Sequence, residues 1–148
     1  MFRTEIPIEI QDIVDDVVRD QLKRHPDVVT DGDKIFNIYG ILGLGSNLLA
    51  KVLGIEEERL AEVIKEGIDE NLKSRLDKSF AYASILEHEV HEPYKISGII
   101  RTKTEALKKA PYSRYSPLRS PLECMMQGDI DLVLFETQMR FQQLNEQR

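Results

Sequence analysis

The chain has 148 residues, of which 31% are charged and 41% hydrophobic, and 26 acidic against 20 basic residues give a net charge of −6. This length suits one domain with a sizeable core, and no apolar run approaches the roughly 20 residues that cross a bilayer. The single cysteine, Cys124, excludes a disulfide within the chain. Together with an N-terminus that lacks a secretory apolar region, it predicts a cytoplasmic protein.

The first predicted element is an amphipathic helix. Apolar residues between Ile10 and Leu22 recur every three or four positions, which is the spacing of one helical face. Pro7 favours a first helical turn, and Pro26 disfavours helical geometry in the residue before it. We therefore expect a helix that begins near Pro7 and ends just before Pro26. Two elements follow it, a turn over residues 28–33 and a short apolar helix over residues 34–42.

Residues 46–65 have the spacing of two short helices that pack across a bend. Leu49 and Ala50 would lie on the first helix, and Gly54 can adopt the left-handed backbone conformation that ends it. Leu60 would point back from the second helix. The segment resembles the helix-turn-helix unit of DNA-binding proteins. This resemblance implies that the outward face of the second helix enters the major groove.

That outward face is acidic. Residues 56–66 carry five acidic and two basic side chains, for a net charge of −3. Carboxylates repel phosphates, and Glu56, Glu57, Glu58 and Glu62 offer none of the donors that read base edges. Acidic residues in a first turn also stabilise a helix through its dipole. If this unit meets DNA, we expect that the second helix does not read bases in the usual way.

The second half of the chain predicts one long helix and several short elements. Apolar residues from Ile68 to Val90 recur at helical spacing, so we expect a helix of about 25 residues and about 37 Å over 68–92. Such a length suggests packing between subunits or along another long helix. The remaining predicted elements are a short strand or irregular connection over 94–100, a short helix that a capping box begins at Thr102 and Pro111 ends, and a final helix over 130–147.

A basic segment stands apart from this acidic body. Residues 101–119 carry six basic residues and one acidic residue, a net charge of +5, whereas the rest of the chain carries −11. Residues 111–121 contain three prolines, three serines and two arginines without apolar periodicity. We therefore predict a helical domain over 1–100, a basic linker or arm over 101–121, and a C-terminal helix over 122–148.

Such an arm could grip DNA phosphates, could bind a protein through its tyrosines and arginines, or could be a solvated loop. For the DNA interpretation, the candidate contact residues are the exposed cations of this segment and of the helix-turn-helix unit. They are Lys51, Arg59, Arg101, Lys103, Lys108, Lys109, Arg114 and Arg119.

The chain carries no clear catalytic or metal-binding motif. His88 and His91 lie close together in sequence, but neither has a Glu three positions before it, and a metal needs three or four ligands. Cys124 precedes two methionines and fits a small buried hydrophobic residue. No serine lies in a Gly-x-Ser-x-Gly turn. We therefore expect a protein that is not an enzyme and that holds no cofactor or metal.

The predicted fold is all-α, with a helix-turn-helix-like core, an N-terminal helix, one long helix and a C-terminal helix. A helix-turn-helix body with a long oligomerising helix is similar in layout to the small terminase subunits of tailed phages. That resemblance implies a non-enzymatic DNA-associated protein, as an oligomeric packaging or regulatory subunit. The alternative is a helical adaptor that binds proteins without nucleic acid. Neither hypothesis involves a membrane.

Overall fold

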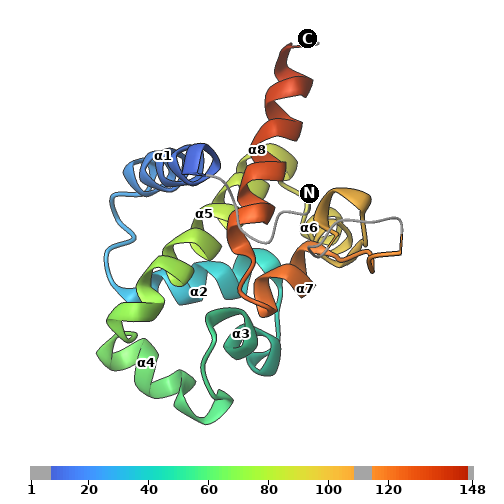
Figure 1. The fold of residues 1–148 in the computed structure, drawn as a ribbon. Helices are drawn as coiled ribbons and strands as arrows, with labels where there is room; N and C mark the ends of the chain where they lie inside the picture. Colours follow the sequence, from blue (N-terminus) through green and yellow to red (C-terminus); the bar gives the residue numbers. More distant parts are fainter. Residues whose placement is uncertain (1–7, 109–114, 147–148) are drawn as a thin grey trace.

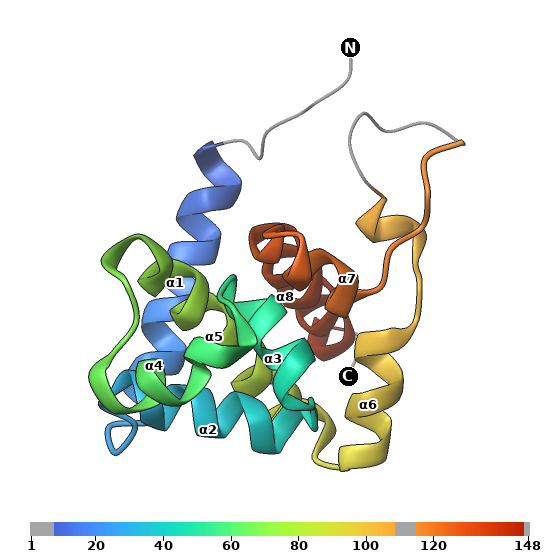
Figure 2. The same cartoon turned by 90° about the horizontal axis from the view of Figure 1, so that it is seen from below.

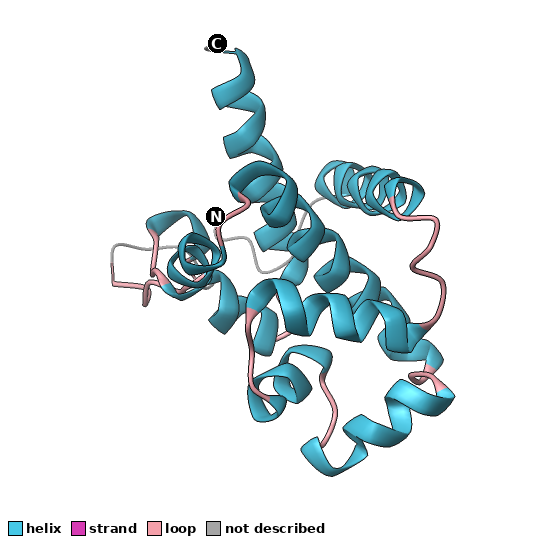
Figure 3. Cartoon of the chain, turned by 180° about the vertical axis from the view of Figure 1, so that it is seen from behind, coloured by secondary structure: helices cyan, strands magenta, loops and turns pink. Residues whose placement is uncertain are grey.

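The structure is a computed structural model that describes residues 8–108 and 115–146, and over these ranges it is helical with no β-strand (Figures 1 and 3). The predicted all-α class is thereby confirmed. The α-helices are α1 (Ile8–Arg24), α2 (Asp31–Leu42), α3 (Ser46–Leu53), α4 (Leu60–Glu66), α5 (Lys73–Val90), α6 (Pro93–Arg101), α7 (Pro121–Met126) and α8 (Ile130–Glu146). Three short 3-10 helices join them, η1 (Glu57–Arg59), η2 (Glu70–Leu72) and η3 (Glu105–Leu107).

Helix α5 is the centre of the molecule. It packs against α1, α2 and α8, and Figure 1 shows it crossing the body between them. Leu76 and residues 79–86 of α5 are all buried, so most of its circumference faces other helices. A helix that is apolar on most sides needs such surroundings, because each large aliphatic side chain contributes about 1.5–3 kcal/mol when it leaves water.

Helix α1 confirms the first predicted element. It extends from Ile8 to Arg24, and Pro7 lies outside the described residues. Val14 and Val17 are buried, whereas Asp12 and Asp16 are exposed, as the apolar periodicity predicts. The apolar stripe of α1 therefore faces α5 and α8, and its acidic side faces water.

Helix α2 begins three residues earlier than predicted, because a capping box starts it. The Thr30 hydroxyl accepts a hydrogen bond from Asp33 N at 3.1 Å, and the Asp33 carboxylate accepts one from Thr30 N at 3.1 Å. The backbone hydrogen bond from Thr30 lowers the pKa of Asp33. The cap therefore stabilises the fold above the ordinary carboxyl pKa and is lost as the pH falls through the lowered value.

The long helix is shorter than predicted. Helix α5 has 18 residues and begins at Lys73, after the 3-10 helix η2. Gly67 has a φ of 100°, and the Asp31 carboxylate accepts a hydrogen bond from Ile68 N at 2.8 Å. The backbone N–H of Ile68 therefore has a hydrogen-bond partner without being in a helix. As a result, residues 68–72 do not join α5 in one continuous α-helix.

Two elements of the second half differ from prediction. Residues 94–100, expected as a strand or an irregular connection, lie in α6, whose first turn contains Pro93. In the described part of the helix predicted from Thr102, residues 105–107 form the 3-10 helix η3, which the Thr104 side chain caps, and residues 109–111 lie outside the described residues. Helix α7 was not predicted as an element separate from the C-terminal helix over 122–148; Ser120 and Glu123 form the capping box that begins it, and residues 127–129 separate it from α8.

Two glycines of α2 should respond in opposite ways to alanine. A Cβ on Gly32 would lie 2.5 Å from the backbone oxygen of Ile64 in α4, whereas a Cβ on Gly40 would meet nothing within 4 Å. Alanine favours a helix over glycine by about 1 kcal/mol, but a clash with backbone costs about 1–3 kcal/mol. We expect Gly40→Ala to raise the free energy of unfolding and Gly32→Ala to lower it, as measured by urea denaturation. An equal gain from both would contradict the close α2–α4 contact.

Candidate functional site

The segment that resembles a helix-turn-helix unit folds as two helices across a bend. Helix α3 ends at Gly54, which has a φ of 77°, and the chain then passes through η1 into α4. Ala50, Leu53 and Val63 are buried, so the two helices share the core with α2 and α5. The spacing of residues 46–65 therefore predicted the local backbone path correctly.

An apolar groove lies between α2, α3 and α4. Its volume is about 160 Å³, and its lining residues are Ile35, Phe36, Tyr39, Ser46, Leu49, Leu60 and Ile64. Two of these are large aromatic side chains that remain largely in water, since Phe36 is 60% exposed and Tyr39 is 53% exposed. Exposed aromatic side chains beside a groove are typical of protein-binding surfaces.

The sequence contained a signal for this groove. Ile35, Ile38 and Leu42 form one stripe of α2 that faces the core. Phe36 and Tyr39 form a second apolar stripe beside the first. A short surface helix needs only one such stripe to reach the core, so a second stripe is either covered by another element or exposed, and the structure shows that here it is largely exposed.

Acidic side chains lie at the edge of the groove. The Ser46 hydroxyl, from a residue that lines the groove, donates a hydrogen bond to the Glu57 carboxylate at 3.1 Å. Arg59 lies 3.9 Å from the Asp69 carboxylate. Among the residues that the structure describes, Glu58, Glu62 and Glu66 form no ion pair. This end of the molecule therefore presents an apolar groove within a negatively charged surface.

Four of the cations predicted to contact DNA are exposed, but they come from two separate parts of the structure. Lys51 lies on α3 and Arg59 in η1. Arg101 ends α6, and Lys103 follows it with its ammonium 3.6 Å from the Glu123 carboxylate. Figures 1 and 2 place α6 on the opposite side of the molecule from α4.

Of the other four candidates, the two that the structure describes, Lys108 and Arg119, do not add to an exposed basic surface. Lys108 is buried, with its ammonium 2.8 Å from the Glu105 carboxylate. Arg119 is only 4% exposed. Its guanidinium donates to the carbonyl of Leu107 and to the side chains of Gln127 and Asp129. Lys108 and Arg119 are therefore too buried to form part of a DNA-binding surface. Lys109 and Arg114 lie outside the described residues.

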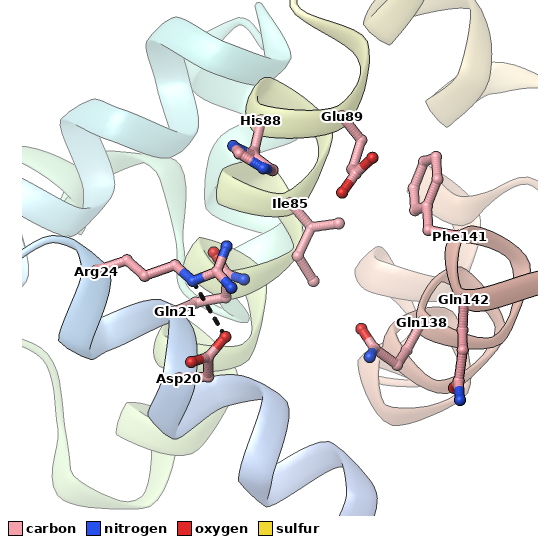
Figure 4. A pocket seen from close by; sticks show the side chains of 9 residues that line it. All are labelled: Asp20, Gln21, Arg24, Ile85, His88, Glu89, Gln138, Phe141 and Gln142. Carbon is pink, nitrogen blue, oxygen red and sulfur yellow. Dashed lines mark ion pairs between the residues drawn. The ribbon is translucent and has the colours of Figure 1, made fainter. Parts of the chain in front are cut away.

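A second depression lies between α1, α5 and α8. Its volume is about 380 Å³, and Figure 4 shows Ile85 of α5 at its centre, with Arg24 of α1 on one side and Phe141 of α8 on the other. Three glutamines also line it. The Asp20 carboxylate lies 3.2 Å from Arg24, so part of the charge here is already neutralised.

All three histidines of the chain line a recess that adjoins this depression. The Ser84 hydroxyl donates to the Gln21 side chain at 2.7 Å, and the His25 Nε2 lies 2.7 Å from the same hydroxyl. With the Ser84 proton directed to Gln21, the tautomer of His25 protonated at Nε2 completes the network. The network thus ties α1 to α5. Within 8–108 and 115–146 no three His, Cys, Asp or Glu side chains are placed to hold a metal ion.

The thiol of Cys124 is expected to react slowly in the native protein. Burial raises its pKa to about 11, and Leu107 O is its hydrogen-bond acceptor. We expect alkylation by iodoacetamide at about pH 8 to be at least about 100-fold slower than in the urea-unfolded chain, because the thiolate is the nucleophile. Mass spectrometry of timed samples measures both rates. Equal rates would show that Cys124 is accessible.

Comparison with known proteins does not add a family to these observations: no family model, curated protein or solved structure matches the chain. The structure itself gives an all-α fold with an apolar groove between α2, α3 and α4, next to the acidic segment 56–66. In the described part of the chain, no helix combines the length and the apolar character that a membrane span requires.

Proposed function

We propose that this chain is a non-enzymatic protein-binding module of the cytoplasm, and that it docks its partner in the groove between α2, α3 and α4. One observation carries the proposal: Phe36 and Tyr39 are largely exposed at a groove whose other lining is almost entirely apolar. Covering apolar surface contributes about 25 cal/mol per Å², and aromatic side chains dominate many interfaces. The single buried thiol fits a reducing compartment.

The charge around the groove supports a protein partner over DNA. In a helix-turn-helix protein that reads DNA, the second helix meets phosphates and base edges. Here the corresponding segment, residues 56–66, has a net charge of −3, and its one arginine, Arg59, lies beside Asp69. Repulsion between carboxylates and phosphates opposes such contact. The same surface is free to approach a protein.

The test compares wild type with the double variant Phe36→Ser/Tyr39→Ser in affinity purification from cells that express the chain. Tyr94→Ser is the matched control, because Tyr94 is 71% exposed on α6, away from the groove. We expect a partner that wild type and Tyr94→Ser retain and that the double variant loses by at least about tenfold. The purified partner should show the same difference by calorimetry. Equal binding by all three proteins would overturn the proposal.

Association with DNA is the second candidate function, in an oligomeric packaging or regulatory subunit. It is favoured by the bend at Gly54 and by the exposed cations Lys51, Arg101 and Lys103. Helix α8 projects from the body in Figure 1, and Leu132 and other half-buried apolar residues line its side, which suits assembly of several copies. Nucleic-acid binding by these cations would weaken steeply with salt.

A variant separates this candidate from the first. Changing Lys51, Arg101 and Lys103 together to Ala should reduce retention on DNA and should lower the slope of log affinity against log salt by up to about three. Light scattering on the wild type then measures the oligomeric state. Unchanged retention by the triple variant would remove the DNA candidate, and protein binding in the groove would be unaffected.

A further inference from the structure

We propose that the occupant of the groove is a cationic peptide segment that inserts one large apolar side chain between α2, α3 and α4. This inference rests on the proposed protein-binding function and names the chemistry of the partner. The depression between α1, α5 and α8 and the recess of the histidines are lined by more polar side chains, and Arg24, which lines both, already pairs with Asp20. The groove is the place where shape, exposed aromatic rings and charge point to one class of ligand.

The volume of the groove determines the size of the ligand side chain that can insert into it, called the anchor below. Its volume is about 160 Å³, and a cavity of about 150 Å³ holds one benzene-sized group. One leucine, methionine or phenylalanine side chain therefore fits. Two of the lining residues carry a hydroxyl, Ser46 and Tyr39, and the hydroxyl of Ser46 already donates to Glu57, while the buried lining residues Ile35 and Leu49 are aliphatic. A polar or charged group at the bottom of the groove would be left without a hydrogen-bond partner, so the inserted side chain is apolar.

The acidic residues around the groove determine the charge of the ligand residues on either side of the anchor. Glu57 lies directly beside the groove through its hydrogen bond with Ser46. Glu58, Glu62 and Glu66 form no ion pair in the described residues and do not line the groove, but they make the surface of η1 and α4 around it acidic, with Lys65 as an exposed cation among them. Lysines and arginines on either side of the anchor would meet this surface, and their attraction would weaken as salt screens it.

A second copy of the chain is the competing occupant. Its exposed cations Lys95, Arg101 and Lys103 lie on or just after α6, on the opposite side of the molecule from α4. Contact between the two sides would join copies head to tail and would give rings or filaments. The free-peptide proposal instead predicts that binding does not depend on self-association.

The experiment selects ligands from a display library of random peptides of roughly 12 residues against the wild-type chain. Peptides that also bind Phe36→Ser/Tyr39→Ser are removed. We expect the remaining peptides to carry a net charge of about +2 or more around one large apolar residue. A synthetic consensus peptide should bind the double aromatic variant at least about tenfold more weakly than wild type.

Charge variants test the rim separately. Glu58→Gln/Glu62→Gln/Glu66→Gln should weaken the consensus peptide by about five- to tenfold at low salt, and less at about 500 mM salt. The matched control Asp12→Asn/Asp15→Asn/Glu87→Gln removes as many exposed carboxylates from α1 and α5 and should leave affinity unchanged. Circular dichroism verifies that both variants retain the wild-type helical content.

Each other outcome overturns the inference. Groove-dependent peptides that are neutral or acidic would refute a cationic partner and leave protein binding in the groove intact. Oligomers that form with rising concentration and disappear in Phe36→Ser/Tyr39→Ser would assign the groove to a second copy. If no groove-dependent peptide is recovered, the inference fails. The partner purification with the same double variant then decides the broader function independently.

Discussion

Arg119→Ala is expected to lower the free energy of unfolding by about 3 kcal/mol, because a buried guanidinium leaves its partners unpaired when it is removed. Arg119 donates to the carbonyl of Leu107 at 2.8 Å and to the Gln127 side chain at 2.8 Å, and it pairs with the Asp129 carboxylate. These partners belong to η3, to the end of α7 and to the segment before α8. We expect urea denaturation, followed by circular dichroism, to show the loss.

Arg101→Ala is the matched control for this prediction. Arg101 belongs to the same basic segment, but it is exposed, and among the described residues its hydrogen bonds go to Ser97, one turn before it in α6. Its removal should change stability by no more than about 0.5 kcal/mol. Arg119→Lys should not restore stability, since an ammonium cannot reproduce the planar fork of donors. Equal losses from Arg119→Ala and Arg101→Ala would show that the buried contacts contribute nothing specific.

Arg75→Ala should also cost about 3 kcal/mol, for a different reason. The guanidinium of Arg75, from α5, donates to the carbonyls of Lys51 and Val52 at 2.9 and 2.7 Å, and to those of Met125 and Met126 at 2.9 and 3.2 Å. These carbonyls lie in the last turns of α3 and α7, where the helix supplies no donor four residues on; those of Lys51 and Met125 also accept from Gly54 N and Gly128 N. One side chain thus caps two helices and joins them to α5. Burial lowers the pKa of Arg75, but the group stays charged at neutral pH.

Hydrogen exchange distinguishes this role from a general loss of stability. In Arg75→Ala, amides in the last turns of α3 and α7 should exchange faster relative to those of α1 than in wild type, because only the former lose their caps. Lys73→Ala is the control, since Lys73 is exposed and lies 3.5 Å from Glu70. It should leave both the exchange pattern and the unfolding midpoint nearly unchanged. Uniform acceleration over all helices in Arg75→Ala would contradict the capping role.

Arg119 and Lys108 show why charge in a sequence is an ambiguous signal. As residue types, Arg119 and Lys108 fit a basic arm, and they contributed to the predicted DNA contacts. Their surroundings depend on residues before and after them in the chain, such as Glu105 for Lys108 and Asp129 for Arg119. The first pair spans three residues across η3, whereas the second joins residues ten apart on either side of α7, a contact that no periodicity reports.

The sequence by itself determined the elements whose signals are local. The apolar stripe of α1, the bend at Gly54 and the buried character of Cys124 all follow from spacing or residue type, and the structure confirms them. The all-α class follows in the same way, since helical periodicity over several segments requires no knowledge of distant contacts.

Only the tertiary structure decided the features that depend on which elements meet. The Asp31 carboxylate interrupts the helical pattern at Ile68, and neighbouring helices leave Phe36 and Tyr39 uncovered. The sequence of α2 shows two apolar stripes, but it does not show that the fold covers only one of them. Whether an apolar or charged side chain lies in the core or at the surface depends on how the whole chain packs and not on the residue type alone.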